Sequence, residues 1–223
     1  MNKKFWIYII TTIALLLLFC ALTVALTLVD VRAAGESGAP VGLATLNEWA
    51  WNAIGQSELA LSISDALGAL FIAAVGAFGV TGLVQVIRRK GILRADRELY
   101  VMAGGLVVLA AVYVLFEIVI VNYRPVLEDG ALAASYPSSH AMLAIAVAGM
   151  GMAYLQARAK KGALTYVLYG ALNVLSVATV VCRVLGGVHW VTDIVGGMLL
   201  GAVIAFAYRA VCALLAKEGE GHE

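Results

Sequence analysis

Charged residues are scarce in this sequence. Of its 223 residues 63% are hydrophobic and only 13% are charged, and the mean hydropathy is +0.96. Soluble globular domains are about half apolar and about a quarter charged, so a compact soluble fold could not hide this much apolar surface. We therefore expect lipid to be the solvent for most of the chain. The formal net charge of +1 gives no indication of nucleic-acid binding.

Cysteine is also rare, and it forms no recognisable cluster. The three cysteines, Cys20, Cys182 and Cys212, lie within or beside apolar runs without a CxxC or Cys/His pattern. We interpret them as small apolar residues. Asp, Glu and Cys form no dense cluster of the kind that holds a metal ion. The sequence therefore predicts chemistry without a metal or another cofactor.

Long apolar runs are abundant. Six are long enough to span a bilayer, since a transmembrane helix needs about 20 apolar residues. The first run follows two lysines and resembles a signal peptide, but its apolar core is too long for a cleaved one, and we interpret it as an uncleaved span. The predicted fold is therefore all-α, a six-transmembrane-helix bundle formed by a single domain over residues 1–223. The predicted spans are 5–29, 59–87, 99–121, 139–157, 163–184 and 190–216.

Basic residues gather on one side of these spans. They lie near both termini and in the links 88–97 and 158–161. The segment 30–58 has one basic residue, Arg32, against four acidic ones. Because cytoplasmic loops are enriched in Lys and Arg, both termini are predicted to be cytoplasmic. The segment 30–58 is then predicted to lie outside the plasma (inner) membrane.

The first outer loop carries two tryptophans, Trp49 and Trp51. Tryptophan is favoured where a membrane meets water, so residues 43–58 predict a short interfacial helix with its indoles at headgroup depth. An ordinary loop with two aromatic residues is the alternative. The polar tail 217–223 is expected to fray.

The rare polar residues gather at the predicted outer ends of the spans. The topology brings residues that are distant in sequence to one membrane face, and ionisable groups at such positions mark functional sites. The residues at this level are Arg124, Ser138, Ser139, His140, Arg183, His189 and Asp193.

The segment CRVLGGVHWVTD, residues 182–193, places His189 and Asp193 four residues apart. On a helix they would share a face. The carboxylate could then accept a proton from one imidazole nitrogen, which would fix the tautomer and leave the other nitrogen free as a base or nucleophile. The alternative is a pair that only caps and solvates the end of a span.

Two further segments suit an anion. In SYPSSHAM, residues 135–142, Pro137 and the serines predict a helix start whose free N–H groups would attract an anion, with His140 in the first turn. Arg124 offers a planar fork of donors that fits a phosphate. A capped helix start and an arginine that reaches toward headgroups are the alternatives. Together the three segments favour phosphoryl transfer, in which positioning and charge stabilisation dominate catalysis.

The three segments resemble the motifs of the type 2 phosphatidic acid phosphatase (PAP2) family. That family has Lys-x6-Arg-Pro, Pro-Ser-Gly-His and Ser-Arg-x5-His-x3-Asp. Here the counterparts are EIVIVNYRP (117–125), PSSH (137–140) and CRVLGGVHWVTD (182–193). The resemblance covers a motif-bearing core of about residues 60–216, and it implies an integral-membrane lipid phosphatase.

The resemblance also implies a role for each site residue. His189 would be the nucleophile that forms a phosphohistidine, Asp193 would orient it, and His140 would be the general acid for the leaving group. Water would then hydrolyse the phosphohistidine. The phosphate oxygens would be bound by Arg124, Arg183, Ser138 and the backbone at Ser139.

Three residues depart from the family pattern. Cys182 stands in place of a serine, Ser139 in place of a glycine, and Glu117 in place of the leading lysine. On a continuous helix, Glu117 and Arg124 would share a face about 10 Å apart. We favour an ion pair of Glu117 with Arg124 or Arg183, because an unpaired charge at this depth is costly. A protonated donor to phosphate, a site for a cation, and a structural contact between spans remain the alternatives.

The sequence thus predicts a phosphatase that acts on a lipid phosphate at the outer leaflet. Prenyl diphosphates such as undecaprenyl diphosphate, phosphatidylglycerophosphate and phosphatidic acid are the expected substrates, and a lateral opening between spans would admit them. A lipid phosphotransferase using the same residues is one alternative. A non-catalytic protein that binds or transports lipid phosphates is another. No nucleic-acid partner is expected, and the oligomeric state is left open.

Overall fold

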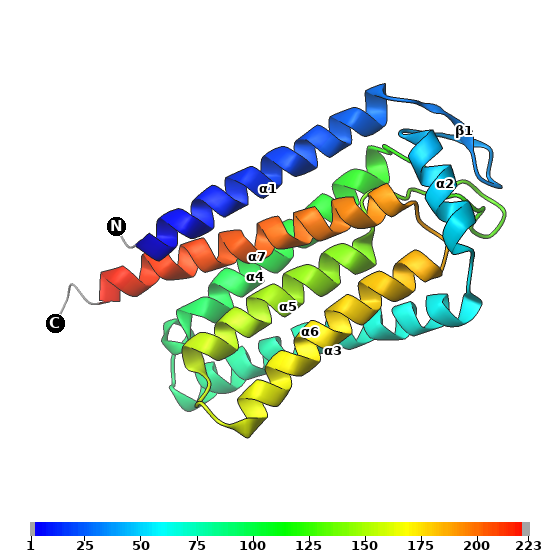
Figure 1. Ribbon diagram of the computed structural model, residues 1–223. Coiled ribbons are helices and arrows are strands. Elements are labelled where there is room, and N and C mark those ends of the chain that lie inside the picture. Colours follow the sequence, from blue (N-terminus) through cyan, green and yellow to red (C-terminus); the bar gives the residue numbers. More distant parts are fainter. Residues whose placement is uncertain (1–2, 220–223) are drawn as a thin grey trace.

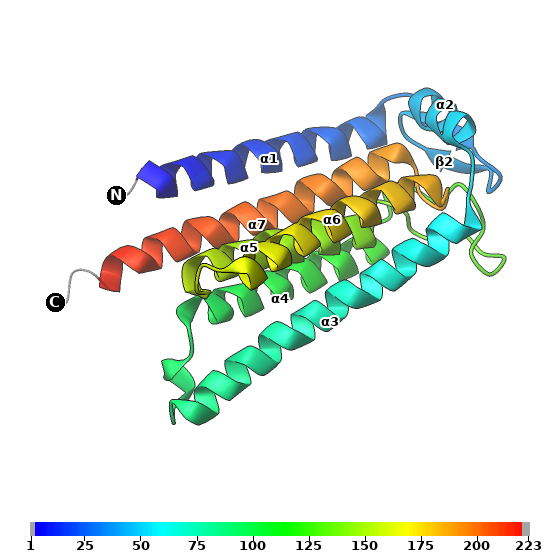
Figure 2. The ribbon, with the colours of Figure 1, turned by 60° about the horizontal axis from the view of Figure 1, so that its bottom comes forward.

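The computed structural model describes residues 3–219. Six long helices run beside one another (Figures 1 and 2), and all six are long and apolar enough to cross a membrane. The predicted spans are confirmed, and every predicted boundary lies within three residues of an observed one. The helices are α1 (Lys3–Leu28), α3 (Glu58–Arg88), α4 (Arg97–Ile118), α5 (Ser139–Arg158), α6 (Ala163–Leu185) and α7 (Val191–Gly219). Residues 220–223 of the tail predicted to fray lie outside the described residues.

Helix α5 is the central helix of the bundle. Half of its candidate span (50%) is buried inside the protein, against 11% of the α1 span. The outer helices expose large hydrophobic side chains such as Leu17, Ile72 and Val107. Helices with apolar side chains toward the outside are stable in lipid because their backbone hydrogen bonds are satisfied internally.

Two glycines of α7 allow it to approach α5 closely. A Cβ atom on Gly197 would lie 2.4 Å from the Ser138 carbonyl oxygen, and one on Gly201 would lie 2.6 Å from that of Met142. Both distances are shorter than a van der Waals contact, so any side chain at either position would force the two helices apart. Small residues four positions apart favour such close packing in membranes. The approach brings the starts of α5 and α7 together.

The connections at that end of the bundle form a cover (Figures 1 and 2). An antiparallel hairpin of β1 (Arg32–Ala34) and β2 (Ala39–Val41) precedes helix α2 (Ala44–Ile54). The hairpin was not predicted, so the fold contains a small strand pair besides its helices. Asn47 of α2 donates to the Thr192 hydroxyl over 2.9 Å, which fixes α2 to the start of α7.

The predicted helix in the first loop is present as α2, and its depth in a membrane stays a prediction. Trp49 is exposed, as an interfacial residue would be. Trp51 instead points into the protein. Its indole donates to the Gly187 carbonyl over 2.8 Å and packs against Trp190 with ring centroids 6.2 Å apart. Trp51 therefore supports the loop that precedes α7.

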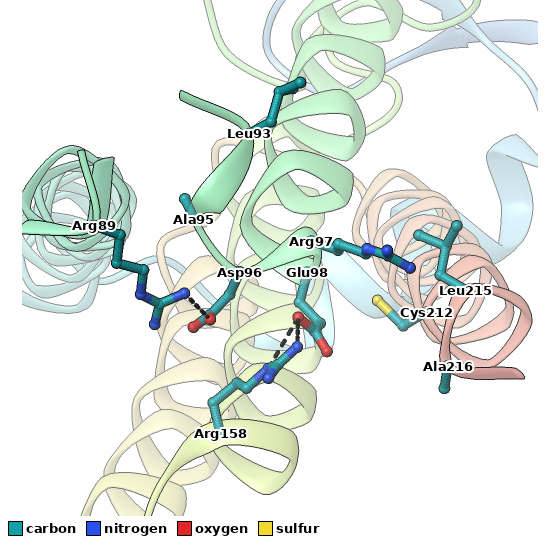
Figure 3. Close-up of a pocket in the computed structure, with 10 residues that line it drawn as sticks. All are labelled: Arg89, Leu93, Ala95, Asp96, Arg97, Glu98, Arg158, Cys212, Leu215 and Ala216. Atoms are coloured by element: carbon teal, nitrogen blue, oxygen red, sulfur yellow. Dashed lines mark hydrogen bonds and ion pairs between the residues drawn. The ribbon is translucent and has the colours of Figure 1, made fainter. Parts of the chain in front are cut away.

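The opposite end of the bundle holds a cleft of about 360 Å³ beside the link between α3 and α4 (Figure 3). This link contains a short 3-10 helix, η1 (Ile92–Arg94). Arg89 pairs with Asp96 at 2.9 Å, and Arg158 pairs with Glu98 at 2.8 Å. Because its carboxylates are paired with arginines, we interpret this cleft as a structural junction between helices.

Candidate active site

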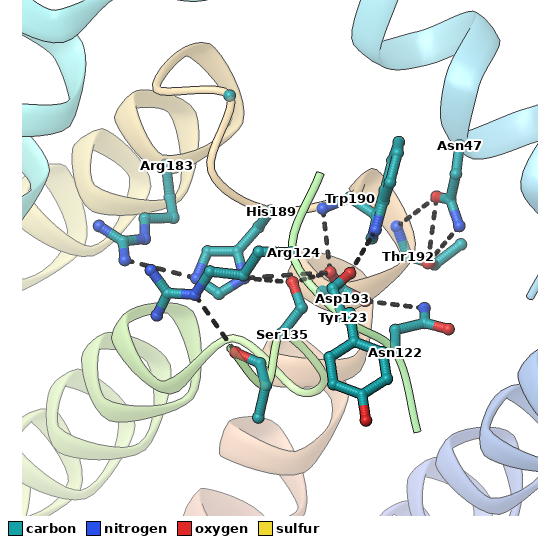
Figure 4. A network of polar contacts seen from close by, with 12 residues as sticks. Asn47, Asn122, Tyr123, Arg124, Ser135, Arg183, His189, Trp190, Thr192 and Asp193 are labelled. Carbon is teal, nitrogen blue, oxygen red and sulfur yellow. Dashed lines mark hydrogen bonds and ion pairs between the residues drawn. The ribbon is translucent and has the colours of Figure 1, made fainter. Parts of the chain in front are cut away.

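The second and third motifs meet where α5 and α7 begin. The Ser138 N–H donates to the Asp193 carbonyl oxygen over 2.9 Å, next to the glycine contacts between the two helices. The extended segment 119–138 crosses over this point and contributes Asn122, Arg124 and Ser135. The structure thus brings Arg124 of the first motif together with Arg183, His189 and Asp193 of the third (Figure 4), and the Ser138 contact adds the second motif.

His189 and Asp193 do not form the direct hydrogen bond that their spacing predicts. His189 Nδ1 lies 3.9 Å from Asp193 Oδ2. The reason is that α7 begins at Val191, so His189 precedes the helix and the four-residue helical geometry does not apply. The Ser135 hydroxyl lies between them, 3.0 Å from His189 Nδ1 and 2.5 Å from Asp193 Oδ2. Sequence reasoning missed Ser135.

Asp193 is fully buried and surrounded by donors. Its Oδ2 accepts from Ser135 and from the Trp190 N–H at 2.9 Å, and its Oδ1 accepts from the Asn122 amide at 3.1 Å. The Trp190 indole in turn donates to the Tyr123 carbonyl over 2.7 Å. The three donors favour the ionised carboxylate, and together they fix its orientation.

His189 is nearly inaccessible to solvent and faces cations. Burial lowers the pKa of His189 well below its ordinary value, and the nearby Arg183, Arg124 and His140 lower it further. Its Nε2 lies 3.4 Å from Nη2 of Arg183. The imidazole is therefore neutral at physiological pH and keeps one unprotonated nitrogen, as a nucleophile requires.

Arg183, in the last turn of α6, is held by α3. Its side chain is 4% exposed, and its Nη1 donates to Ser64 at 3.1 Å and to Oδ1 of Asp65 at 2.8 Å. The same Asp65 oxygen lies 3.3 Å from Nε2 of His140. Asp65 was not among the predicted site residues, although a carboxylate inside an apolar run is a signal that could have identified it.

Arg124 also reaches the site with a carboxylate partner. Its Nε donates to the Ala134 carbonyl at 3.2 Å, and its Nη1 pairs with Glu128 at 3.2 Å. Figure 4 shows its guanidinium beside the His189 ring. Both arginines expected to bind phosphate thus lie near His189.

Glu117 is not part of this arrangement. Helix α4 ends at Ile118, six residues before Arg124, so the continuous helix assumed for the two residues does not exist. Glu117 is exposed and interacts with the Tyr113 hydroxyl one turn earlier. Within residues 3–219 no ion pair joins it to Arg124 or Arg183, whose carboxylate partners are Glu128 and Asp65. The favoured interpretation of Glu117 as a partner of either arginine was wrong.

Two buried polar atoms of the site have no hydrogen-bond partner in the part of the chain that the structure describes. They are Oγ of Ser138, which is fully buried, and Nε of Arg183. Such groups are rare in proteins and call for an explanation, for which a bound anion is suited. Ser139 and His140 lie in the first turn of α5, partly exposed, and half-buried Cys182 precedes Arg183. No described contact brings the Cys182 thiol into the site.

A largely apolar cleft of about 420 Å³ leads away from His140. It lies between α3, α4 and α5. Asp65, Ser139 and His140 line one part of it, and Ile72, Leu109 and Leu143 are among the apolar residues that line the rest. Between Lys3 and Gly219, no group of three His, Cys, Asp or Glu residues is placed to hold a metal ion. The site therefore offers imidazole, guanidinium and hydroxyl groups next to an apolar cleft.

Residues 117–214 match the family model of the PAP2 superfamily, and the match includes all three motifs. This region of the chain belongs to the PAP2 superfamily. The resemblance predicted from the motifs is thereby confirmed. Helices α1, α2 and α3 precede the PAP2 match, so Ser64 and Asp65, which contact Arg183, lie outside the matched region.

The PAP2 fold is found in a solved structure as well. The chain is similar to the crystal structure of a transmembrane PAP2-type phosphatidylglycerolphosphate phosphatase from Bacillus subtilis, with a TM-score of 0.67 and 19% sequence identity. The likeness covers 91% of this chain and 96% of the other. No curated protein sequence matches the chain significantly. The PAP2 fold and the six apolar helices make this chain a multi-pass membrane protein.

Proposed function

We propose that the chain is a lipid phosphatase that works through a phosphohistidine on His189. The observations that carry this proposal are a neutral, buried His189 beside Arg183 and two buried donors without a partner among the described residues, Ser138 Oγ and Arg183 Nε. A tetrahedral anion would satisfy both donors and present its phosphorus to the histidine. The PAP2 match and the phosphatase named in the structural likeness support the same chemistry.

The proposed reaction has two steps. Nε2 of His189 attacks phosphorus and the bond to the leaving oxygen breaks, while His140, which must carry a proton for this step, gives that proton to the oxygen. Neutral His140 then takes a proton from water, whose oxygen attacks phosphorus and breaks the N–P bond. Arg124 and Arg183 stabilise the charge on the phosphate oxygens in both steps. The donor set offers no metal ligands, so we propose that the reaction needs no metal ion.

A lipid substrate fits the apolar cleft beside His140. Its chains would lie against α3, α4 and α5 while the phosphate reaches His189. The basic links lie at the opposite end of the bundle, which supports a site that faces outward from the plasma membrane. Undecaprenyl diphosphate, phosphatidylglycerophosphate and phosphatidic acid are the proposed substrates.

The test is release of phosphate from a panel of these three lipids by purified wild type and His189→Ala. We expect release from at least one lipid by wild type alone. No release from any lipid phosphate would contradict the proposal. Transfer of the phosphoryl group to another acceptor instead of water would favour a phosphotransferase, and product analysis separates the two activities.

The substitution Glu117→Gln is expected to change kcat and KM by no more than about twofold, because exposed side chains away from a site have small effects. Glu117→Lys, which restores the residue of the family motif, should be equally mild. Steady-state kinetics with the best lipid of the panel measures both. A loss of tenfold or more in Glu117→Gln would show that the carboxylate takes part after all.

Asp65 competes with phosphate for Arg183 in the free protein. Its side chain is 55% exposed, so the pair is screened and worth at most about 1 kcal/mol, or about a fivefold change in affinity. Asp65→Asn is therefore expected to lower KM by up to about fivefold. Glu98→Gln, which removes a carboxylate partner of Arg158 at the opposite end, is the matched control and should leave KM unchanged. A higher KM in Asp65→Asn would mean that the carboxylate helps to bind the substrate.

Activity should persist in mild acid. An ordinary histidine has a pKa of about 6.5, and the lowered pKa keeps His189 neutral at more acidic pH. The decrease of kcat/KM toward acid should therefore begin only below pH 6.5. The same shift affects stability, because His189 binds a proton more readily in the unfolded chain than in the folded protein. The free energy of unfolding should therefore decrease as the pH falls below about 6.5. A pH–rate profile of the free enzyme is the measurement. An acid limb above pH 6.5 would contradict a buried neutral nucleophile.

A further inference from the structure

Ser135 lies outside the three motifs, yet it occupies the space between His189 and Asp193 (Figure 4). It is 3% exposed. Its N–H donates to the Asn122 carbonyl at 2.9 Å, and its neighbour Ala134 forms a β-bridge with Tyr123. These backbone contacts hold the serine in place independently of its hydroxyl group.

The hydroxyl has one proton, and its two contacts decide where that proton points. The 2.5 Å distance to Asp193 is typical of a hydroxyl that donates to a carboxylate. A carboxylate that already accepts from Asn122 and Trp190 can only accept from Ser135 as well. Ser135 Oγ must therefore accept from His189, which places a proton on Nδ1 of the imidazole.

The other side of the ring leads independently to the same tautomer. Arg183 has donors only, so its contact of 3.4 Å with Nε2 requires Nε2 to be the acceptor. A neutral imidazole with an unprotonated Nε2 has its proton on Nδ1. The contacts of the two ring nitrogens thus indicate the same tautomer, in which Nε2 carries the lone pair.

We propose that Ser135 is a positioning residue that connects His189 to Asp193 through the chain Nδ1–H to Oγ–H to Oδ2. The proposal rests on the phosphatase function proposed above and extends it beyond the residues of the motifs. When Nε2 bonds to phosphorus, the ring becomes cationic and keeps its Nδ1 proton. Ser135 then conveys the stabilising charge of Asp193 across a gap of 3.9 Å that is too long for a direct hydrogen bond.

The kinetic test compares Ser135→Ala, Ser135→Thr and wild type. Ser176→Ala is the matched control, because Ser176 is also buried and its hydroxyl donates to the Asn173 carbonyl within α6. We expect Ser135→Ala to lower kcat by about 10²- to 10³-fold with KM changed less than about threefold, since a catalytic imidazole depends on the carboxylate that orients it and stabilises its cationic form. Ser135→Thr keeps the hydroxyl and should recover at least about tenfold of that loss. A kcat for Ser135→Ala within about threefold of Ser176→Ala would overturn the proposal.

A second readout does not depend on turnover. The sequence has only three histidines, so ¹⁵N-labelled histidine gives a simple NMR spectrum in which the His189 signals are those lost in His189→Ala. We expect wild-type His189 to be protonated at Nδ1 alone, and we expect its Nδ1 signal to shift in Ser135→Ala because the hydrogen bond to Oγ is lost while Arg183 still faces Nε2. Protonation at Nε2 in wild type would overturn the proposal even if Ser135→Ala fails to fold. If wild type releases no phosphate from any lipid, the function fails while this spectrum still decides the hydrogen-bond chain.

Discussion

Replacing His189 with alanine is expected to lower kcat for the preferred lipid phosphate by about 10⁴-fold or more, the largest effect of any single substitution in this chain. Loss of a nucleophile removes the covalent path itself, and only the binding contribution of the site remains. His189 has the two properties that this path requires, a neutral ring and an Nε2 lone pair beside Arg183. Phosphate release under saturating substrate measures the effect.

His140→Ala is the informative comparison for His189→Ala. A general acid contributes about 10²- to 10⁴-fold, and less when the leaving group is a weak base. The loss in His140→Ala should therefore be smaller for a prenyl diphosphate than for phosphatidic acid, whereas the loss in His189→Ala should be the same for both. Residual activity of a few per cent in His189→Ala would contradict the assigned nucleophile.

Arg183→Lys is expected to lower kcat/KM by about 10²- to 10³-fold even though the charge is kept. Removing one aligned donor from a site that stabilises developing charge typically has this effect, and lysine lacks the planar fork that binds phosphate through two nitrogens. Without substrate, Nη1 of Arg183 donates to Ser64 and Asp65, and Nη2 lies toward His189. Its buried Nε has no described partner and is free for a phosphate oxygen.

Arg209→Lys is the matched control for Arg183→Lys, since Arg209 lies on α7 toward the opposite end of the bundle. It should leave kcat/KM unchanged. Binding of orthovanadate, a phosphate analogue, should weaken in Arg183→Lys and not in Arg209→Lys. If lysine at position 183 supports wild-type activity, the fork has no special role and Arg183 acts only as a positive charge.

The six spans were predictable because each depends on a local property. An apolar run of about 20 residues forms a helix in lipid wherever it lies in the sequence. The location of the motif residues was predictable because successive spans alternate in direction. This alternation places Arg124, His140 and His189 at the same end of the bundle. The hairpin before α2 was not predictable, because it is held by tertiary contacts with segment 119–138, such as the hydrogen bond from the Ser37 N–H to the Pro125 carbonyl.

The contacts inside the site depend on tertiary structure that no motif encodes. The spacing of His189 and Asp193 predicted a direct pair, but helix α7 starts two residues after His189 and Ser135 fills the gap. The sequence favoured Glu117 as the carboxylate partner of an arginine, whereas Glu128 and Asp65 have that role. Asp65, on a helix outside the PAP2 match, holds Arg183, and only the packing of α3 against α6 shows this.

Trapping of the phosphohistidine on His189 is the most direct test of the proposed mechanism. Purified protein is mixed with a radiolabelled lipid phosphate, quenched in alkali, in which phosphohistidine is stable, and digested to locate the label. Stoichiometric label is expected on His189, and this label should be lost on acid treatment and absent from His189→Ala. Steady turnover without label on His189 in wild type, or label that persists in His189→Ala, would contradict it.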